Sequence, residues 1–194
     1  HMNHFVVAIG REFGAQGCDI AEKLAEKLGV KLYDRQLVEE AAKKLEMDEH
    51  TVQKADEVSA KDIEGLKTTY GVGNFYLSTQ VLDAQADIIE RVAQNESCII
   101  MGRCADYILR SRPDVLRVFV YADRDIRLRR AIDEYGDLEE HIDEFMHQTD
   151  KRRRIYYENY TNQRWGDREN YDLMLNSGDL GIEKCVELIC QAVK

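Results

Sequence analysis

The hydrophobic pattern of the chain is a series of short apolar runs, each followed by a longer amphipathic stretch. The runs are rich in valine, isoleucine and leucine, which is typical of strands buried inside a sheet. They predict strands at Phe5–Ile9, Val30–Asp34, Cys98–Met101, Val115–Tyr121 and Leu173–Asn176. Strands that alternate with helices favour a parallel sheet covered by helices on both faces, so the predicted fold class is α/β.

The stretches between the runs repeat apolar residues at helical spacing. In the first, Ile20, Leu24 and Leu28 share one face, and Gly29 follows as a typical helix terminator. Further helices are predicted at Gln36–Leu45, from Leu82 to near Asn95, and at Asp125–Tyr135, Leu138–Tyr160 and Ile182–Val193.

Two segments are longer than a simple crossover between strands requires. They are Gln36–Asn95 and Gly136–Asp167, and we interpret both as excursions from a single domain that spans residues 1–194. Within the first, Asp48 or Thr51 is the candidate cap of another helix. Residues 68–74 have the composition of a loop.

Three glycines, Gly10, Gly14 and Gly17, lie between the first predicted strand and the first predicted helix. At such a position the backbone N–H groups of the helix start point toward an anion, and glycine lets the backbone approach it closely. The pattern G-x-x-x-x-G-K-[ST] is absent, since no lysine occurs between Gly10 and Cys18. Two interpretations stay open: a phosphate-binding loop, and a tight turn without a ligand.

The charge and cysteine content narrow the function classes. A net charge of -10 and an isoelectric point near 5.0 argue against general nucleic-acid binding and against binding to anionic membranes. No apolar run approaches the roughly 20 residues of a membrane span. The five cysteines are scattered, without a C-x-x-C spacing, and the first strand begins without the pattern of a signal peptide. We therefore expect a cytoplasmic protein.

Three groups of motifs occur in a fixed order along the chain. R-E-[FY]-G is present at Arg11–Gly14, and G-R-C-A-D-Y at Gly102–Tyr107. Y-Y-x-x-Y-T, W-G-D and N-Y-D-L follow between Tyr156 and Leu173. In this order the motifs resemble those of the cytidylate kinase-like family, which is related to the nucleoside monophosphate kinases, and the resemblance spans nearly the whole chain.

The resemblance implies a P-loop kinase fold, a three-layer α/β/α arrangement around a five-stranded parallel sheet. It also implies a monophosphate-binding insertion at about residues 36–95 and a helical lid at about residues 136–160. The implied reaction is phosphoryl transfer from ATP, with Mg²⁺, to a nucleoside monophosphate such as CMP. Two alternatives stay open: a nucleotide-binding or regulatory protein with weak or no kinase activity, and a kinase of another small metabolite.

The chain departs from cytidylate kinases proper at three positions. Gly17 stands where they have the lysine of the phosphate-binding loop, and Met101 where they have an aspartate near the magnesium. Cys104 replaces the acid that follows their Gly-Arg pair. The resemblance therefore predicts the fold more firmly than the activity, and the metal ligands stay unknown.

The candidate ligands of the nucleotide phosphates lie in the loop and at the start of the helix. They are Gly10, Gly14, Ala15, Gln16, Gly17, Cys18 and Asp19. Arg11 is the candidate replacement for the missing lysine, because a planar guanidinium binds phosphate through two parallel hydrogen bonds. The alternative for Arg11 is a salt bridge to Glu12 or Asp34.

The candidate acceptor site lies at the carboxyl end of the predicted sheet, where ligands bind in open α/β folds. Arg103 follows a buried strand and Gly102, and the resemblance implies that it holds the acceptor phosphate; its alternative is a structural ion pair. Asp34 ends another strand at this edge and is a candidate for orienting the acceptor or, through water, a magnesium ion. Asp106 is a further candidate, with a helix cap as its alternative.

The predicted lid carries the basic cluster Lys151–Arg154. The resemblance implies that lid arginines reach the transferred phosphoryl group. Together with Arg11, the predicted catalytic residues are therefore Arg130 and Arg154. The alternative is a solvated helix face paired with nearby acids. Tyr156, Tyr157, Tyr160 and Trp165 follow the cluster and are interpreted as packing residues or as a platform for a base.

Overall fold

The centre of the molecule is a five-stranded, all-parallel sheet. The computed structural model describes residues 3–56, 72–136 and 138–193, and of residues 72–78 the backbone only. The strand order is β2-β3-β1-β4-β5. The strands are β1 (Val6–Arg11), β2 (Lys31–Tyr33), β3 (Cys98–Met101), β4 (Val115–Tyr121) and β5 (Leu173–Asn176).

Residues 6–9 of the central strand β1 are apolar on both faces, because helices cover both sides of the sheet there. Val6 and Ala8 of β1 pack into one core layer, and Val7 and Ile9 pack into the layer on the other face. All four side chains are at most 1% exposed. This double burial explains the continuous apolar runs that predicted the strands.

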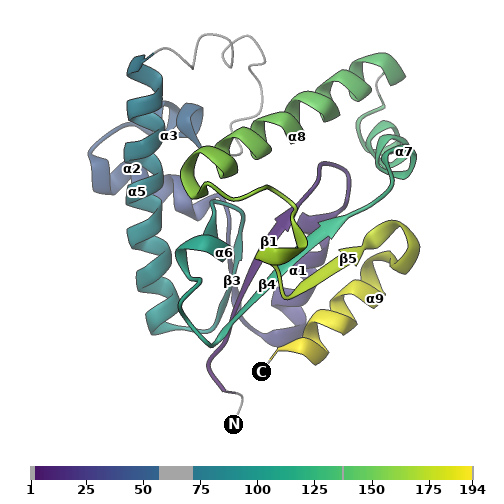
Figure 1. Cartoon of the computed structure of the whole chain (residues 1–194), viewed down its shortest axis with the longest axis horizontal. Coiled ribbons are helices and arrows are strands. Elements are labelled where there is room, and N and C mark those ends of the chain that lie inside the picture. The colour runs from purple at the N-terminus through teal and green to yellow at the C-terminus, as the bar shows by residue number, and fades with distance from the viewer. Residues whose placement is uncertain (1–2, 57–71, 137, 194) are drawn as a thin grey trace.

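The helices form the two outer layers of a three-layer α/β/α arrangement. One layer contains α2, α3, α5 and α6, and the other contains α1 and α9 (Figure 1). The helices, with one 3₁₀ turn (η1), are α1 (Gly17–Leu28), α2 (Gln36–Leu45), α3 (Glu49–Ala55), α5 (Val72–Asn95), α6 (Ala105–Ile108), α7 (Arg124–Tyr135), α8 (Glu139–Thr161), η1 (Arg168–Asn170) and α9 (Ser177–Ala192).

Most predicted boundaries agree with the structure within one or two residues, and the exceptions have local causes. The first strand runs on to Arg11, because the glycine loop starts only after the last pairing of β1 with β4. The last helix begins at Ser177, where the Asn176 side chain accepts a hydrogen bond from the Gly178 N–H at 3.1 Å. Of the predicted loop 68–74, residues 72–74 belong to α5, and residues 68–71 lie outside the described residues.

The helix α8 lies across the edge of the sheet toward which the strands point (Figure 1). At this edge the loops after β1, β3 and β4 meet, which is the usual ligand-binding side of an open α/β sheet. The segment predicted as a lid thus lies over the predicted site. None of the described helices combines the length and the apolarity that a membrane crossing demands.

Candidate functional site

The loop after β1 leaves the start of α1 open. Gly14 has a φ of 78° and Gln16 a φ of 65°, so the chain turns through left-handed conformations before α1 begins at Gly17. No side chain caps this helix. The first N–H groups of a helix have no partner within the helix, and together with the helix dipole they attract an anion. The geometry of the loop therefore fits a phosphate group.

Arg11 fills the space beside Gly17. A Cβ added at Gly17 would lie 2.7 Å from both Cβ and Cγ of Arg11, closer than side chains approach one another. Arg11 itself is only 4% exposed. The arginine side chain thus passes the position at which the resembling kinases carry their loop lysine, and the glycine there makes room for it.

Two arginine side chains, those of Arg11 and Arg153, lie near the start of α1. A guanidinium N–H of Arg153, on α8, donates to the backbone oxygen of Arg11 at 3.2 Å. Desolvation by the surrounding protein raises the pKa of the Cys18 thiol, and the guanidiniums of Arg11 and Arg153 partly counteract this rise. The carboxylates of Asp34 and Glu22 add to it. Both arginines therefore lie close enough to the open helix start to act on an anion bound there.

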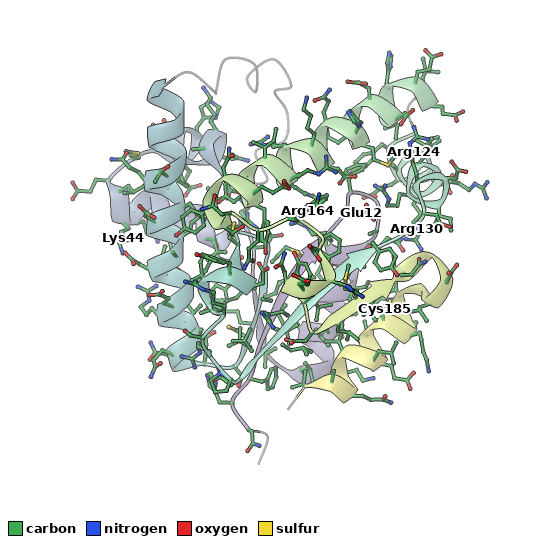
Figure 2. All side chains as sticks on the ribbon, viewed as in Figure 1. Glu12, Lys44, Arg124, Arg130, Arg164 and Cys185 are labelled. Atoms are coloured by element: carbon green, nitrogen blue, oxygen red, sulfur yellow. The ribbon has the colours of Figure 1, made fainter. Side chains whose placement is uncertain are left out.

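The two other predicted catalytic arginines have different surroundings. Arg154 is exposed, and its guanidinium lies 5.6 Å from the centre of the Trp165 ring. Arg130 extends from α7 beside the loop that carries Glu12 (Figure 2). It donates to the Gly14 oxygen at 3.3 Å, and to the hydroxyl and backbone oxygens of Ser177 at 3.1 and 2.9 Å. Arg130 thus braces the loop, and the catalytic roles of Arg130 and Arg154 stay predictions.

Ser177 completes this brace from the far end of the chain. It is fully buried, and its hydroxyl group donates to the backbone oxygen of Ala15 at 2.7 Å. The glycine loop is therefore held from α7 and from the junction of β5 and α9. These contacts fix the loop without using the N–H groups that open α1.

Gly14 cannot be replaced without displacing α7, and this gives a first testable expectation. A Cβ at Gly14 would lie 2.8 Å from the backbone oxygen of Arg127, whereas one at Gly29 would meet nothing within 4 Å. Both glycines have a positive φ, which costs about 1–2 kcal/mol for other residues. We expect Gly14→Ala to weaken ATP binding and to lower stability by more than Gly29→Ala does. Urea unfolding and calorimetric titration with ATP measure both effects, and equal ATP affinities of the two variants would contradict the expectation.

The turn after β3 has a strained backbone. Gly102, Arg103 and Cys104 have φ angles of 62°, 50° and 57°. Two consecutive non-glycine residues in the left-handed region are costly and need compensation by their surroundings. The turn directs the Arg103 side chain into the protein, where it is 1% exposed.

Two carboxylates and a backbone oxygen bind the buried guanidinium of Arg103. Its Nε and one terminal nitrogen donate to the two oxygens of Asp56 at 3.1 and 2.9 Å. The other terminal nitrogen donates to Asp34 and, at 3.1 Å, to the oxygen of Met101. The Asp56 side chain is 1% exposed and that of Asp34 is 32% exposed. This geometry favours the ion-pair alternative, and acceptor binding by Arg103 stays a prediction.

Asp56 is the functional-site residue that the sequence analysis missed. It also accepts a hydrogen bond from Gln85 of α5 at 3.0 Å, and its backbone oxygen accepts one from Arg152 of α8 at 2.8 Å. In the sequence it lies within a polar, charged stretch, residues 47–67, without a distinguishing pattern. The only signal was indirect, because a buried arginine requires a buried acid.

Asp106 does not cap the short helix that follows β3. The N-cap position is Cys104, and Asp106 lies in the first turn of α6. The carboxylate is 9% exposed and accepts a hydrogen bond from the Tyr157 hydroxyl at 2.7 Å. Burial and the neighbouring Asp106 carboxylate raise the pKa of Tyr157. The hydrogen bond from Tyr157 connects α8 to α6. The helix-cap alternative for Asp106 is wrong, because the N-cap residue is Cys104. The acceptor role of Asp106 stays a prediction.

The residues fit a magnesium–nucleotide complex only if the phosphates supply much of the metal coordination. Within residues 3–56, 72–136 and 138–193, no three histidine, cysteine or acidic side chains are grouped so that they could hold a metal ion. Mg²⁺ commonly keeps several waters and binds through one or two carboxylates and the phosphates of its substrate. The half-exposed Asp34 is available for such a water-mediated contact.

Comparisons with known proteins identify the family of the chain and its fold. The family model described as the cytidylate kinase-like family matches residues 6–179. No curated protein matches the chain significantly. The structure of an uncharacterized protein from Eubacterium ventriosum is 26% identical, covers 98% of both chains and superposes with a TM-score of 0.74.

Two more distant structures share the fold. Shikimate kinase from Bacteroides thetaiotaomicron is 16% identical over 97% of both chains, with a TM-score of 0.55. Deoxyadenosine kinase from M. mycoides, solved with bound dATP, is 15% identical over 97% of this chain and 98% of its own, with a TM-score of 0.53. The chain therefore has the P-loop kinase fold, as its sequence predicted.

Proposed function

Since the chain belongs to the cytidylate kinase-like family, we propose that it transfers a phosphoryl group from ATP, as its magnesium complex, to a small acceptor. The family and the P-loop kinase fold support phosphoryl transfer in general. A nucleoside monophosphate such as CMP is the first acceptor to test, because the family description points to it. The two substrates would then be small-molecule nucleotides, ATP and a nucleoside monophosphate. We also propose a cytoplasmic location.

The observation that carries the proposal is the position of Arg11 beside Gly17. Phosphoryl transfer depends on positioning and on neutralising the charge of the moving group. Arg11 brings a permanent cation to the place of the missing lysine, and its planar fork matches two phosphate oxygens. In this proposal the loop keeps its positive charge, and Arg11 carries it in place of the lysine.

The other charged groups fit the same reaction. Backbone N–H groups at the start of α1 would hold the phosphates of ATP. Arg153, whose guanidinium already reaches the backbone of Arg11, is the lid arginine best placed to approach the transferred group. Bound magnesium supplies further charge neutralisation through the phosphates. Arg153 therefore replaces Arg154 as the preferred lid residue of this proposal.

The engagement of Arg103 favours a second candidate at the acceptor side. Its guanidinium is paired with both Asp34 and Asp56, so two carboxylates already balance its charge. A dianionic monophosphate would have to displace Asp34 to reach Arg103. A kinase of another small metabolite therefore stays a candidate, and so does a nucleotide-binding or regulatory protein with weak or no kinase activity.

A coupled assay with a panel of acceptors tests the proposal. We expect ATP consumption that depends on one acceptor and on Mg²⁺, with nucleoside monophosphates and small hydroxylated metabolites compared in parallel. Calorimetric titration with an ATP analogue runs alongside. Binding of the analogue without turnover of any acceptor would support the regulatory alternative, and absence of both binding and turnover would reject the proposed function.

A further inference from the structure

The peptide groups on both sides of Phe13 are held by other parts of the protein. The Phe13 N–H donates to one oxygen of Asp150 at 2.8 Å. The Phe13 oxygen accepts from a terminal nitrogen of Arg127 at 3.1 Å, and the same nitrogen donates to the second oxygen of Asp150 at 2.8 Å. Asp150, Arg127 and Phe13 thus form a closed triangle of hydrogen bonds at the tip of the glycine loop.

Arg127 is a fixed point in this triangle. It is 8% exposed, and its Nε donates to the backbone oxygen of Ala122 at 2.9 Å. Its other terminal nitrogen lies 3.5 Å from a carboxylate oxygen of Glu12. Gly14 lies directly against its backbone, as the close approach of a Cβ to the Arg127 oxygen shows. Arg127 is therefore held by the junction between β4 and α7 and by the glycine loop, and Asp150 adds a contact from α8.

The Phe13 side chain also contacts α7 and α8. Its ring stacks on that of Tyr135, with centroids 6.2 Å apart, and meets the edge of Phe145 at 5.3 Å. The N–H of Phe13 is already bonded to Asp150, so it does not belong to the groups that receive an anion. Phe13 connects the loop to α7 and α8 through both its backbone and its ring.

We propose that Asp150 is a positioning residue that keeps the glycine loop in the shape required by the nucleotide phosphates. It acts through the Phe13 amide and Arg127 and touches no nucleotide itself. The expected change in ATP affinity rests on the proposed function. The expected change in the stability of the loop does not. Asp150 also joins α8 to the loop, so that a movement of this helix changes the loop.

A graded series of variants separates the two bonds of Asp150. Asp150→Ala removes both bonds. Asp150→Asn keeps an oxygen for the Phe13 N–H but places an amide donor opposite Arg127. The matched control is Asp143→Ala, because Asp143 also lies on α8 and pairs with Arg124 of α7, away from the loop.

Hydrogen exchange without any nucleotide is the first measurement. We expect the amides of residues 12–17 to exchange at least tenfold faster in Asp150→Ala and about threefold faster in Asp150→Asn, with Asp143→Ala unchanged. If Asp150→Ala does not fold, Asp150→Asn decides alone. Wild-type exchange of the loop in Asp150→Asn, or an equal acceleration in Asp143→Ala, would overturn the proposal.

Nucleotide affinity is the second measurement. We expect Asp150→Ala to weaken ATP binding at least tenfold in calorimetric titration, while Asp143→Ala binds ATP within a factor of two of wild type. Wild-type protein that fails to bind ATP would reject the proposed function, and the exchange measurement would still test Asp150. Wild-type protein that binds ATP, combined with unchanged ATP affinity in Asp150→Ala, would reject the role of Asp150 alone.

Discussion

Arg11→Ala is expected to lower phosphoryl transfer by at least a hundredfold. The variant removes the side chain whose Cβ and Cγ lie beside Gly17 and whose guanidinium, in the proposed function, takes the role of the missing loop lysine. Hydrogen bonds to charged groups contribute about 1.5–3 kcal/mol each, so two bonds to phosphate amount to about 3–6 kcal/mol, and 1.4 kcal/mol is a factor of ten in rate. Steady-state rates with the preferred acceptor measure the loss.

A second substitution shows whether the position of the charge is what matters. The double variant Arg11→Ala, Gly17→Lys removes the side chain that blocks position 17 and places a lysine there. We expect it to recover part of the lost activity. Gly17→Lys alone should be less stable than wild type, since its Cβ would lie 2.7 Å from the Arg11 side chain. Full activity of Arg11→Ala would contradict the proposed role of Arg11.

Arg103→Ala is expected to destabilise the fold by about 3–5 kcal/mol, because it leaves the buried Asp56 carboxylate without its charged partner. Urea unfolding measures the change. The matched control is Arg117→Ala. A terminal nitrogen of Arg117 lies 3.2 Å from a carboxylate oxygen of Asp172, and the Asp172 side chain is 40% exposed. Pairs at the surface contribute about 0–1 kcal/mol, so the control should lose far less stability.

Urea unfolding of a double variant distinguishes the two roles considered for Arg103, a buried ion pair and acceptor binding. If the arginine serves chiefly as a buried ion-pair partner, the double variant Arg103→Met, Asp56→Leu should be more stable than Arg103→Ala, because well-packed apolar groups often replace a buried ion pair without loss. If Arg103→Ala keeps the stability of wild type and loses only acceptor use, the acceptor role predicted from the sequence is the correct one.

The sequence predicted the strands and helices well because their signals are local. A run such as Cys98–Met101 is apolar because a layer of helices covers each face of the sheet there, and the observed β3 has these bounds. The strand order β2-β3-β1-β4-β5 depends on which runs pair, and no local pattern contains that information. The sequence therefore predicted a five-stranded parallel sheet but no order for its strands.

The candidate site was predicted less completely, for a geometric reason. Consecutive residues of an α-helix point about 100° apart, since a turn contains 3.6 residues. Arg153 reaches the loop, whereas its neighbour Arg154 lies exposed against Trp165. To choose between them requires knowing which face of α8 packs on the core. Asp56 was not predicted, because its partner Arg103 lies in the turn after β3, 47 positions further along the chain.

The contact between Ser177 and Ala15 also has a consequence for the order in which the molecule matures. The two residues lie 162 positions apart, and the hydroxyl group of Ser177 binds the loop directly. Chains are synthesised from the N-terminus, so β1 and the glycine loop leave the ribosome long before Ser177 does. The nascent chain can pair β1 with β3 and β4 early, while its loop still lacks this brace. The brace on the glycine loop is therefore completed late in synthesis, when the fifth strand and the start of α9 have joined the sheet.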